Sequence, residues 1–146
     1  MTQNLTTVVS SKTQTVEINR DSPTVIIGER INPTGRKLML KAMKEGDFEM
    51  VRNDALSQVA AGAKILDVNT GVPGVDETAL MKKALSTVME AVEVPLCIDT
   101  ADIDALAAGL ELYAGKALIN SVNGEERSLS TVLPLAKEHG AAVIAL

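Results

Sequence analysis

Short apolar runs alternate with longer amphipathic segments from Val25 to the end of the chain. The runs are rich in Val, Ile and Leu and have the length of buried strands. The segments between them have helical periodicity, as in the apolar stripe of Ile103, Leu106 and Leu110. This alternation predicts repeated βα units around a parallel sheet. We expect the strands at 25–30, 63–69, 95–100, 116–121 and 141–146.

The expected helices carry recognisable start and stop residues. One helix should span 48–61 and end before Gly62, and the last helix should end before Gly140. Pro134 lies in that last helix, either in its first turn or at a kink. Capping residues precede two further helices: Asp76 or Thr78 near Leu80, and Thr100 or Asp102 near Ile103.

The expected fold is α/β, the N-terminal part of a TIM-type (βα)8 barrel with about five parallel strands. We interpret 1–22 as an N-terminal extension and 23–146 as a barrel domain truncated at the fifth strand. A full barrel needs eight strands and roughly 250 residues. A complete five-stranded doubly wound sheet is the alternative for a chain of this length.

Charge and composition narrow the kind of partner. The net charge is −5, and no cluster of basic residues alternates with aromatics, so a nucleic-acid partner is not expected. No apolar run is long enough to span a membrane, and the N-terminus does not resemble a signal peptide, so we expect a cytoplasmic protein. The single cysteine, Cys97, lies in an apolar run and is expected to be a buried apolar side chain.

Polar residues end each of the first four expected strands. They are Glu29, Asp67 with Asn69, Asp99, and Asn120. Strand C-termini share one rim of a parallel barrel, so these side chains could converge on one pocket. Carboxylates and amides without a lysine or histidine suit a neutral heterocycle, such as a 2-amino-4-oxopyrimidine edge. The alternative is that they are turn and cap residues.

Several other chemistries lack their residues. His139, the single histidine, lies in an expected last helical turn, where it complements the helix dipole. No phosphate-binding P-loop, Rossmann glycine motif or hydrolase elbow occurs in the chain. Asp67 and Asp99 without a phosphate motif are a weak magnesium signal, so no metal site is expected.

The strand-end motifs resemble those of a known family. They are I-G-E-R-I-N (27–32), L-D-V-N (66–69), C-I-D-T (97–100) and I-N-S-V-N (119–123). In this order they resemble the pterin-binding domain of methyltetrahydrofolate:corrinoid protein methyltransferases and of cobalamin-dependent methionine synthase. The resemblance covers about residues 24–146, and three of the motifs more distantly resemble dihydropteroate synthase.

This resemblance implies roles for six residues. Asp99 and Asn120 would hydrogen-bond the pterin ring. The polar floor and network around the ring would be formed by Glu29, Asn32, Asp67 and Asn69. Asp102 stands where related corrinoid methyltransferases often carry Asn, and its role is left unassigned. The family's residue near the pterin N5 atom would lie beyond Leu146, so no catalytic residue is assigned.

The implied reaction is transfer of the N5 methyl group of methyltetrahydrofolate to the cobalt of a corrinoid (cobalamin) carried by a partner protein or domain. A dihydropteroate synthase relative is an alternative, although I-G-E-R-I-N replaces the N-V-T-P-D-S-F type of loop of that enzyme. A non-catalytic pterin-binding fragment is another. Half a barrel leaves an open strand edge, which favours self-association, for instance as a homodimer.

Overall fold

A computed structural model describes residues 5–146. Two strands form an antiparallel hairpin, β1 (Thr7–Ser10) and β2 (Thr15–Ile18). Five form a parallel sheet: β3 (Ile27–Ile31), β4 (Ile65–Asn69), β5 (Leu96–Asp99), β6 (Leu118–Val122) and β7 (Ala142–Ala145). The helices are α1 (Lys37–Lys44), α2 (Glu49–Ala60), α3 (Glu77–Ala91), α4 (Ile103–Leu112) and α5 (Glu126–Glu138).

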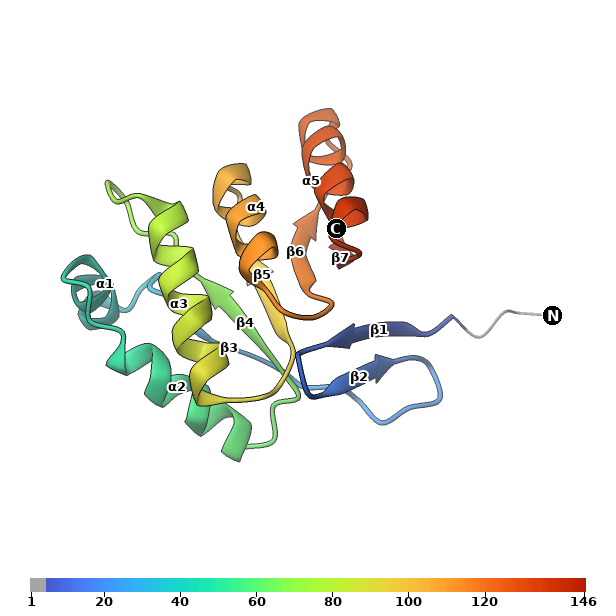
Figure 1. The fold of residues 1–146 in the computed structure, drawn as a ribbon, viewed down its shortest axis with the longest axis horizontal. Helices are drawn as coiled ribbons and strands as arrows, with labels where there is room; N and C mark the ends of the chain where they lie inside the picture. The colour runs from blue at the N-terminus through green and yellow to red at the C-terminus, as the bar shows by residue number, and fades with distance from the viewer. Residues whose placement is uncertain (1–4) are drawn as a thin grey trace.

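The order of strands in the sheet is the order of strands in the chain. It runs β3-β4-β5-β6-β7, and each adjacent pair is parallel (Figure 1). A doubly wound sheet reverses its strand order at a switch point, and this sheet does not. The doubly wound alternative is therefore wrong. The prediction of part of a TIM-type barrel is confirmed.

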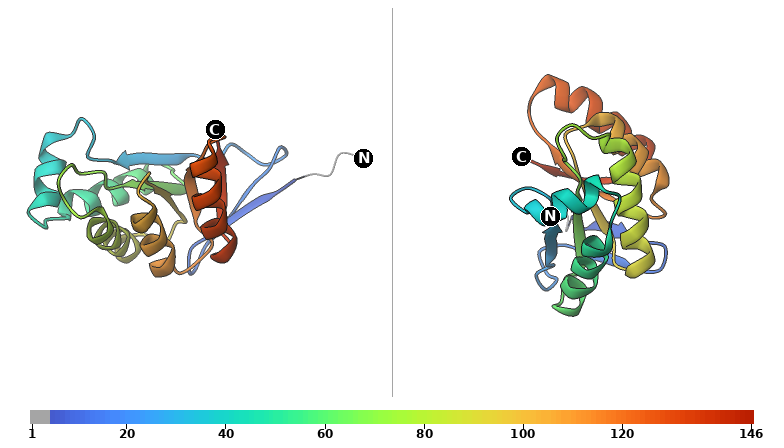
Figure 2. Two further views of the ribbon diagram at one scale, coloured as in Figure 1. Left: turned by 90° about the horizontal axis from the view of Figure 1, so that it is seen from above. Right: turned by 90° about the vertical axis from the view of Figure 1, so that its left-hand side faces the viewer.

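The two faces of the sheet are covered differently. Leu66, Ile98 and Ile119 belong to the large core that the helices cover, so the helices lie on one side of the sheet (Figure 2). Ile65, Cys97 and Leu118 point to the other side, because side chains alternate along a strand. They form a second, smaller core with Val9 of the hairpin. This second side corresponds to the inside of a barrel.

The hairpin is attached at the end where the strands begin. The backbone N–H of Ser10 donates to the carbonyl of Lys116, just before β6, at 2.9 Å. Tyr113, which follows α4, donates its hydroxyl to the carbonyl of Ser10 at 2.9 Å and accepts from the backbone N–H of Leu96 at 3.0 Å. The described part of the 1–22 segment thus closes the floor and leaves the strand C-termini open.

Most expected helix ends agree with the structure. The side chain of Asp76 caps α3 and that of Asp102 caps α4, each accepting two backbone N–H groups. Gly62 and Gly140 follow the C-caps of α2 and α5 with φ of 103° and 64°. Pro134 lies inside α5, beyond its first turn, so the kink alternative describes its position better. The ends of the observed strands differ from the expected ranges by at most two residues.

Helix α1 is not among the helices that the sequence predicts. It is only eight residues long and carries no side-chain cap at its N-terminus. Only Met39 and Met43 are buried on it, while Leu38 is 74% exposed. The segment is amphipathic, but two turns with two buried residues four apart are too short a pattern to distinguish a short helix from a loop.

Candidate functional site

Polar side chains gather where β4, β5 and β6 end. In the ladder of parallel strands, Asn69 is level with Asp99, and Asp99 is level with Asn120. Asp67 lies two residues earlier on β4 and is level with Cys97. All four polar residues are on the inner side, the side of Ile65 and Leu118. We call Asp67, Asn69, Asp99 and Asn120 the rim cluster.

Each carboxylate of the rim cluster accepts a hydrogen bond from an amide on another strand. Asn69 donates from Nδ2 to Oδ2 of Asp99 at 2.9 Å. Asn120 donates from Nδ2 to Oδ1 of Asp67 at 3.2 Å. The second bond links β6 to β4 across the intervening β5, and the peptide bond that follows Asn120 is cis. Four of the five side chains predicted to converge therefore do so, and each of the four is hydrogen-bonded to another member of the cluster.

The electrostatics of the cluster are set mainly by burial. Asp67 is 5% exposed, and this burial raises the pKa of its carboxyl above the usual range. The hydrogen bond from Asn120 lowers that pKa in part, and the negative charge of Asp99 raises it further. Burial also raises the pKa of the Cys97 thiol, so Cys97 is an unreactive neighbour of Asp67 rather than a nucleophile.

An open cavity adjoins the rim cluster on the side of α5. It has a volume of about 360 Å³, and of the six predicted site residues only Asp99 and Asn120 line it. The other lining residues come from the ends of β5 and β6 and from α5: Thr100, Ala101, Ser121, Asn123, Glu125, Arg127, Ser128 and Thr131. A carboxylate and an amide thus face a space open to a small molecule, with hydroxyl groups and one arginine nearby.

Glu29 and Asn32 do not join the rim cluster in the described part of the chain. Glu29 is exposed, and the ladder between β3 and β4 shifts register between Gly28 and Ile31. Asn32 accepts a hydrogen bond from the backbone N–H of Thr34 at 2.9 Å, which makes it a turn residue. The register shift explains why the first strand end departs from the pattern of the other three.

The sequence pattern does not predict the ion pairs that Asp54 makes with Arg30 and Arg36. Arg36 of the loop after β3 pairs with Asp54 of α2 and donates to the carbonyl of Arg30. Arg30 also pairs with Asp54 at 3.4 Å, and its backbone N–H donates to Gln58 at 2.8 Å. These contacts fix the loop that carries Asn32.

Arg127 is likewise absent from the predicted site, although it lies in the first turn of the helix that follows Asn120.

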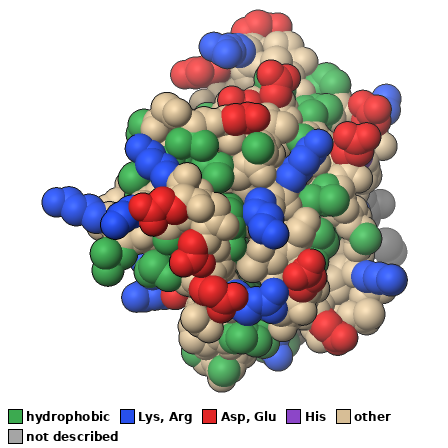
Figure 3. All heavy atoms as spheres, turned by 60° about the vertical axis from the view of Figure 1, so that its left-hand side comes forward, with side chains coloured by type: hydrophobic (Ala, Val, Ile, Leu, Met, Phe, Trp, Pro, Cys, Tyr) green, Lys and Arg blue, Asp and Glu red, His purple; other side chains and the backbone are tan. Residues whose placement is uncertain are grey.

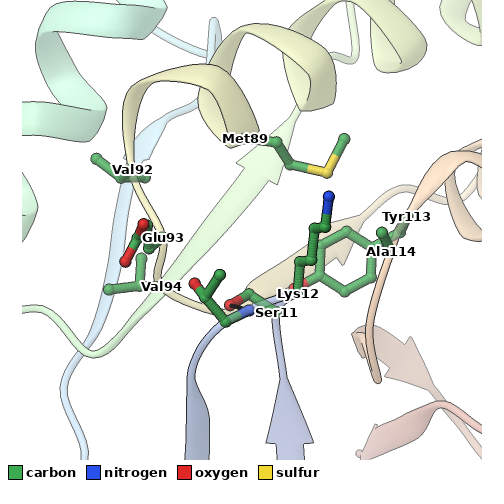
Figure 4. Close-up of a pocket in the computed structure, with 9 residues that line it drawn as sticks. Ser11, Lys12, Met89, Val92, Glu93, Val94, Tyr113 and Ala114 are labelled. Atoms are coloured by element: carbon green, nitrogen blue, oxygen red, sulfur yellow. Dashed lines mark hydrogen bonds between the residues drawn. The ribbon is translucent and has the colours of Figure 1, made fainter.

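A second cavity lies at the opposite end of the sheet (Figure 4). It has a volume of about 260 Å³ between the hairpin turn and the ends of α3 and α4. Met89, Val94 and Tyr113 supply apolar walls, and Lys12 supplies a charge at its edge. Because ligands of parallel α/β folds bind at the C-terminal ends of strands, this basal cavity is the weaker candidate.

Residues 5–146 offer neither a metal-binding group of side chains nor a membrane-spanning helix. In this range, no three His, Cys, Asp or Glu side chains are grouped so as to hold a metal ion. None of its helices has both the length and the apolar character needed to cross a bilayer. On the face seen in Figure 3, acidic and basic side chains are interspersed.

Comparison with known proteins places the chain in a family. Residues 28–146 match the family model described as pterin binding enzyme. The chain is 35% identical over 143 residues to methionine synthase of Mycobacterium tuberculosis, covering 94% of this chain and 12% of that protein. It is 39% identical over 111 residues to methylcorrinoid:tetrahydrofolate methyltransferase of Eubacterium limosum, covering 76% of this chain and 41% of that protein.

Solved structures share the fold. Dihydropteroate synthase of Thermus thermophilus superposes with a TM-score of 0.58 at 24% identity, covering 94% of this chain and 47% of that one. Homocysteine methyltransferase of Escherichia coli superposes with a TM-score of 0.56 at 14% identity, covering 86% and 61%. The present chain thus spans only part of each of these proteins. Its family match and its sequence relatives together show that it belongs to the pterin binding enzymes.

Proposed function

We propose that this chain forms the pterin-binding part of a methyltransferase that exchanges a methyl group between N5 of tetrahydrofolate and the cobalt of a corrinoid carried by a partner protein or domain. The single observation that carries the proposal is that Asp99 and Asn120 lie side by side at the C-terminal ends of β5 and β6 and line the same cavity. The relatives named methionine synthase and methylcorrinoid:tetrahydrofolate methyltransferase support the reaction class. We expect the protein in the cytoplasm.

The donors and acceptors of the site fit a pterin edge. An ionised carboxylate such as Asp99 only accepts hydrogen bonds, and it can take two from adjacent N–H groups. An amide such as Asn120 both accepts and donates. The pyrimidine ring of a pterin offers N–H groups and an unprotonated ring nitrogen along one edge. No strong cation lies within the rim cluster itself, which suits a ring that carries no charge.

The chemistry explains why the ring must be held firmly. N5 is a poor leaving group in methyl transfer, so it needs a proton or a strong hydrogen bond as the carbon–nitrogen bond breaks. Groups fixed by the sheet hold the ring in one orientation and so keep the methyl group in line with its acceptor. In this scheme the rim cluster binds and orients the pterin, and we assign none of its members as the proton donor.

One site can serve methyl transfer in either direction between tetrahydrofolate and the corrinoid. We favour transfer from methyltetrahydrofolate to the corrinoid, but the name of the Eubacterium limosum relative describes the opposite direction. The same site serves both directions, because the forward and reverse reactions share one transition state. Likeness to dihydropteroate synthase is one of fold and does not favour condensation with p-aminobenzoate as a second function.

Asp99→Ala tests the proposal directly. The change removes a charged acceptor worth about 1.5–3 kcal/mol, so we expect methyltetrahydrofolate to bind about 10- to 100-fold more weakly. Isothermal titration calorimetry under anaerobic conditions measures the loss. Asp104→Ala, an exposed carboxylate in the first turn of α4, is the matched control and should bind as the wild type does. Equal binding by the Asp99 variant would contradict the proposal.

A further inference from the structure

Asp67 is the rim-cluster residue that is hardest for a ligand to reach. It is 5% exposed, whereas Asn69, Asp99 and Asn120 are only partly buried. It lies two residues before Asn69 along β4, level with Cys97 and not with Asp99. The cavity beside the cluster is lined by Asp99 and Asn120 but not by Asp67. Any effect of Asp67 on a ligand must therefore pass through a neighbouring side chain.

Asn120, which lines the cavity, is one such neighbour, and its Nδ2 donates to Oδ1 of Asp67 at 3.2 Å. An amide side chain can be turned over, which exchanges its oxygen and its nitrogen with little change in shape. An ionised carboxylate accepts hydrogen bonds and cannot donate them. If Asn120 were turned over, two acceptor oxygens would face each other in a buried place, which is unfavourable. Asp67 therefore keeps Nδ2 of Asn120 turned toward its own carboxylate.

The amide of Asn69 is held in one orientation in a similar way. Its Oδ1 accepts from the backbone N–H of Gly71 at 2.9 Å, and its Nδ2 donates to Asp99 at 2.9 Å. Neither amide of the rim cluster is thus free to exchange its ends. The order of donors and acceptors around the cavity is fixed before any ligand arrives.

We propose that Asp67 is a positioning residue that sets the orientation of Asn120 and so makes the site select reduced pterins. This inference rests on the proposed function. With one Nδ2 hydrogen bonded to Asp67, Asn120 offers a ligand its Oδ1 as an acceptor and its second Nδ2 hydrogen as a donor. A matching ligand presents an N–H beside an unprotonated ring nitrogen. A tetrahydropterin has that pair at N8 and N1, whereas N8 of a fully oxidised pterin carries no hydrogen.

Asp67→Asn removes the constraint while keeping the size of the side chain. An amide at position 67 both donates and accepts, so Asn120 can adopt either orientation. The wild type should bind tetrahydrofolate more tightly than folic acid, which carries the same tail on an oxidised ring. In the variant this preference should fall about two- to tenfold, the factor of one net hydrogen bond of about 0.5–1.5 kcal/mol.

Asp76→Asn is the matched control. It makes the same change of charge at the exposed N-cap of α3, where asparagine also caps well. Both affinities are measured by anaerobic calorimetry for the wild type and the two variants, and circular dichroism checks that each is folded. An unchanged ratio of the two affinities in Asp67→Asn would overturn the inference, even if both ligands bind more weakly. A ratio that falls in the control as well would also overturn it.

A measurement without ligand separates this inference from the proposed function. In the free protein, the side-chain NH₂ signal of Asn120 in a nitrogen-15 correlation spectrum should move as Asp67 titrates, and this response should disappear in Asp67→Asn. The signal is assigned by its loss in Asn120→Asp. If the wild type binds no pterin but shows this response, the proposed function fails and the positioning contact stands. If the response is absent, the inference fails whatever the protein binds.

Discussion

At the scale of single residues, Asp67 carries a cost that depends on pH. Burial raises its pKa above the ordinary value of 3.8, so its ionised form is less favoured in the folded chain than in the unfolded chain. The contribution of neutral Asp67 to the free energy of unfolding is therefore fully present below pH 3.8. It is lost as the pH rises through the pKa of Asp67 in the folded chain. The nearby Asp99 adds to the effect, while the Cys97 thiol and Asn120 reduce it.

Asp67→Asn should remove that dependence. The free energy of unfolding of the variant, relative to the wild type, should increase as the pH rises from below 3.8 toward neutrality. Urea unfolding followed by circular dichroism at several pH values measures the difference, and the other carboxyl groups largely cancel in it. A difference that stays constant or decreases with pH would contradict the expectation.

At the scale of secondary-structure elements, Tyr113 joins the hairpin to the sheet. Its hydroxyl bonds both Ser10 of β1 and the buried backbone N–H of Leu96 at the start of β5. In Tyr113→Phe that N–H would lose this partner, which costs about 1–3 kcal/mol. We expect the free energy of unfolding to fall by this amount in urea titrations. Hydrogen exchange at Leu96 should quicken, and unchanged exchange there would argue against the role.

The elements also show what the sequence could and could not predict. Short apolar runs between amphipathic segments located β4, β5 and β6, because strands that are buried on both sides of a parallel sheet consist mostly of apolar residues. Because parallel strands end at one rim, Asn69, Asp99 and Asn120 were expected to lie near one another, and the register of the structure makes them neighbours. The bond between Asp67 and Asn120 could not be predicted, because it crosses β5 and depends on the curvature of the sheet.

Local irregularities account for the remaining differences. The register shift in β3 separates Glu29 from the other strand ends, and Gly28 marks it in the sequence only weakly, because a glycine in a strand can indicate either a bulge or a close approach of another group. The ion pair of Arg36 with Asp54 joins residues 18 apart through a loop and a helix that periodicity does not place. Charged pairs of this kind are visible only once the backbone is known, since their spacing follows no helical or strand period.

At the scale of the whole molecule, the sheet has two open edges in the described chain. β3 pairs only with β4, and β7 pairs only with β6. Apolar side chains lie near these edges, with Ile26 beside β3 at 55% exposed and Leu146 after β7 at 81%. Unpaired strand edges with apolar neighbours favour pairing with another chain. We therefore predict that the 146-residue chain self-associates at micromolar concentration.

Ile26→Lys should weaken that association. Burying an isoleucine side chain contributes about 1.5–3 kcal/mol, and a lysine at a strand edge opposes pairing. The dimer dissociation constant from sedimentation velocity over a range of concentrations should thus rise at least about tenfold. Leu56→Lys is the matched control, because Leu56 is similarly exposed, at 46%, but lies on α2 and not next to a strand edge. A wild-type chain that sediments as a monomer at every concentration would contradict the prediction and show that the hairpin and the turns already protect both edges. An equal effect of the two lysine substitutions would indicate nonspecific contact through the helices.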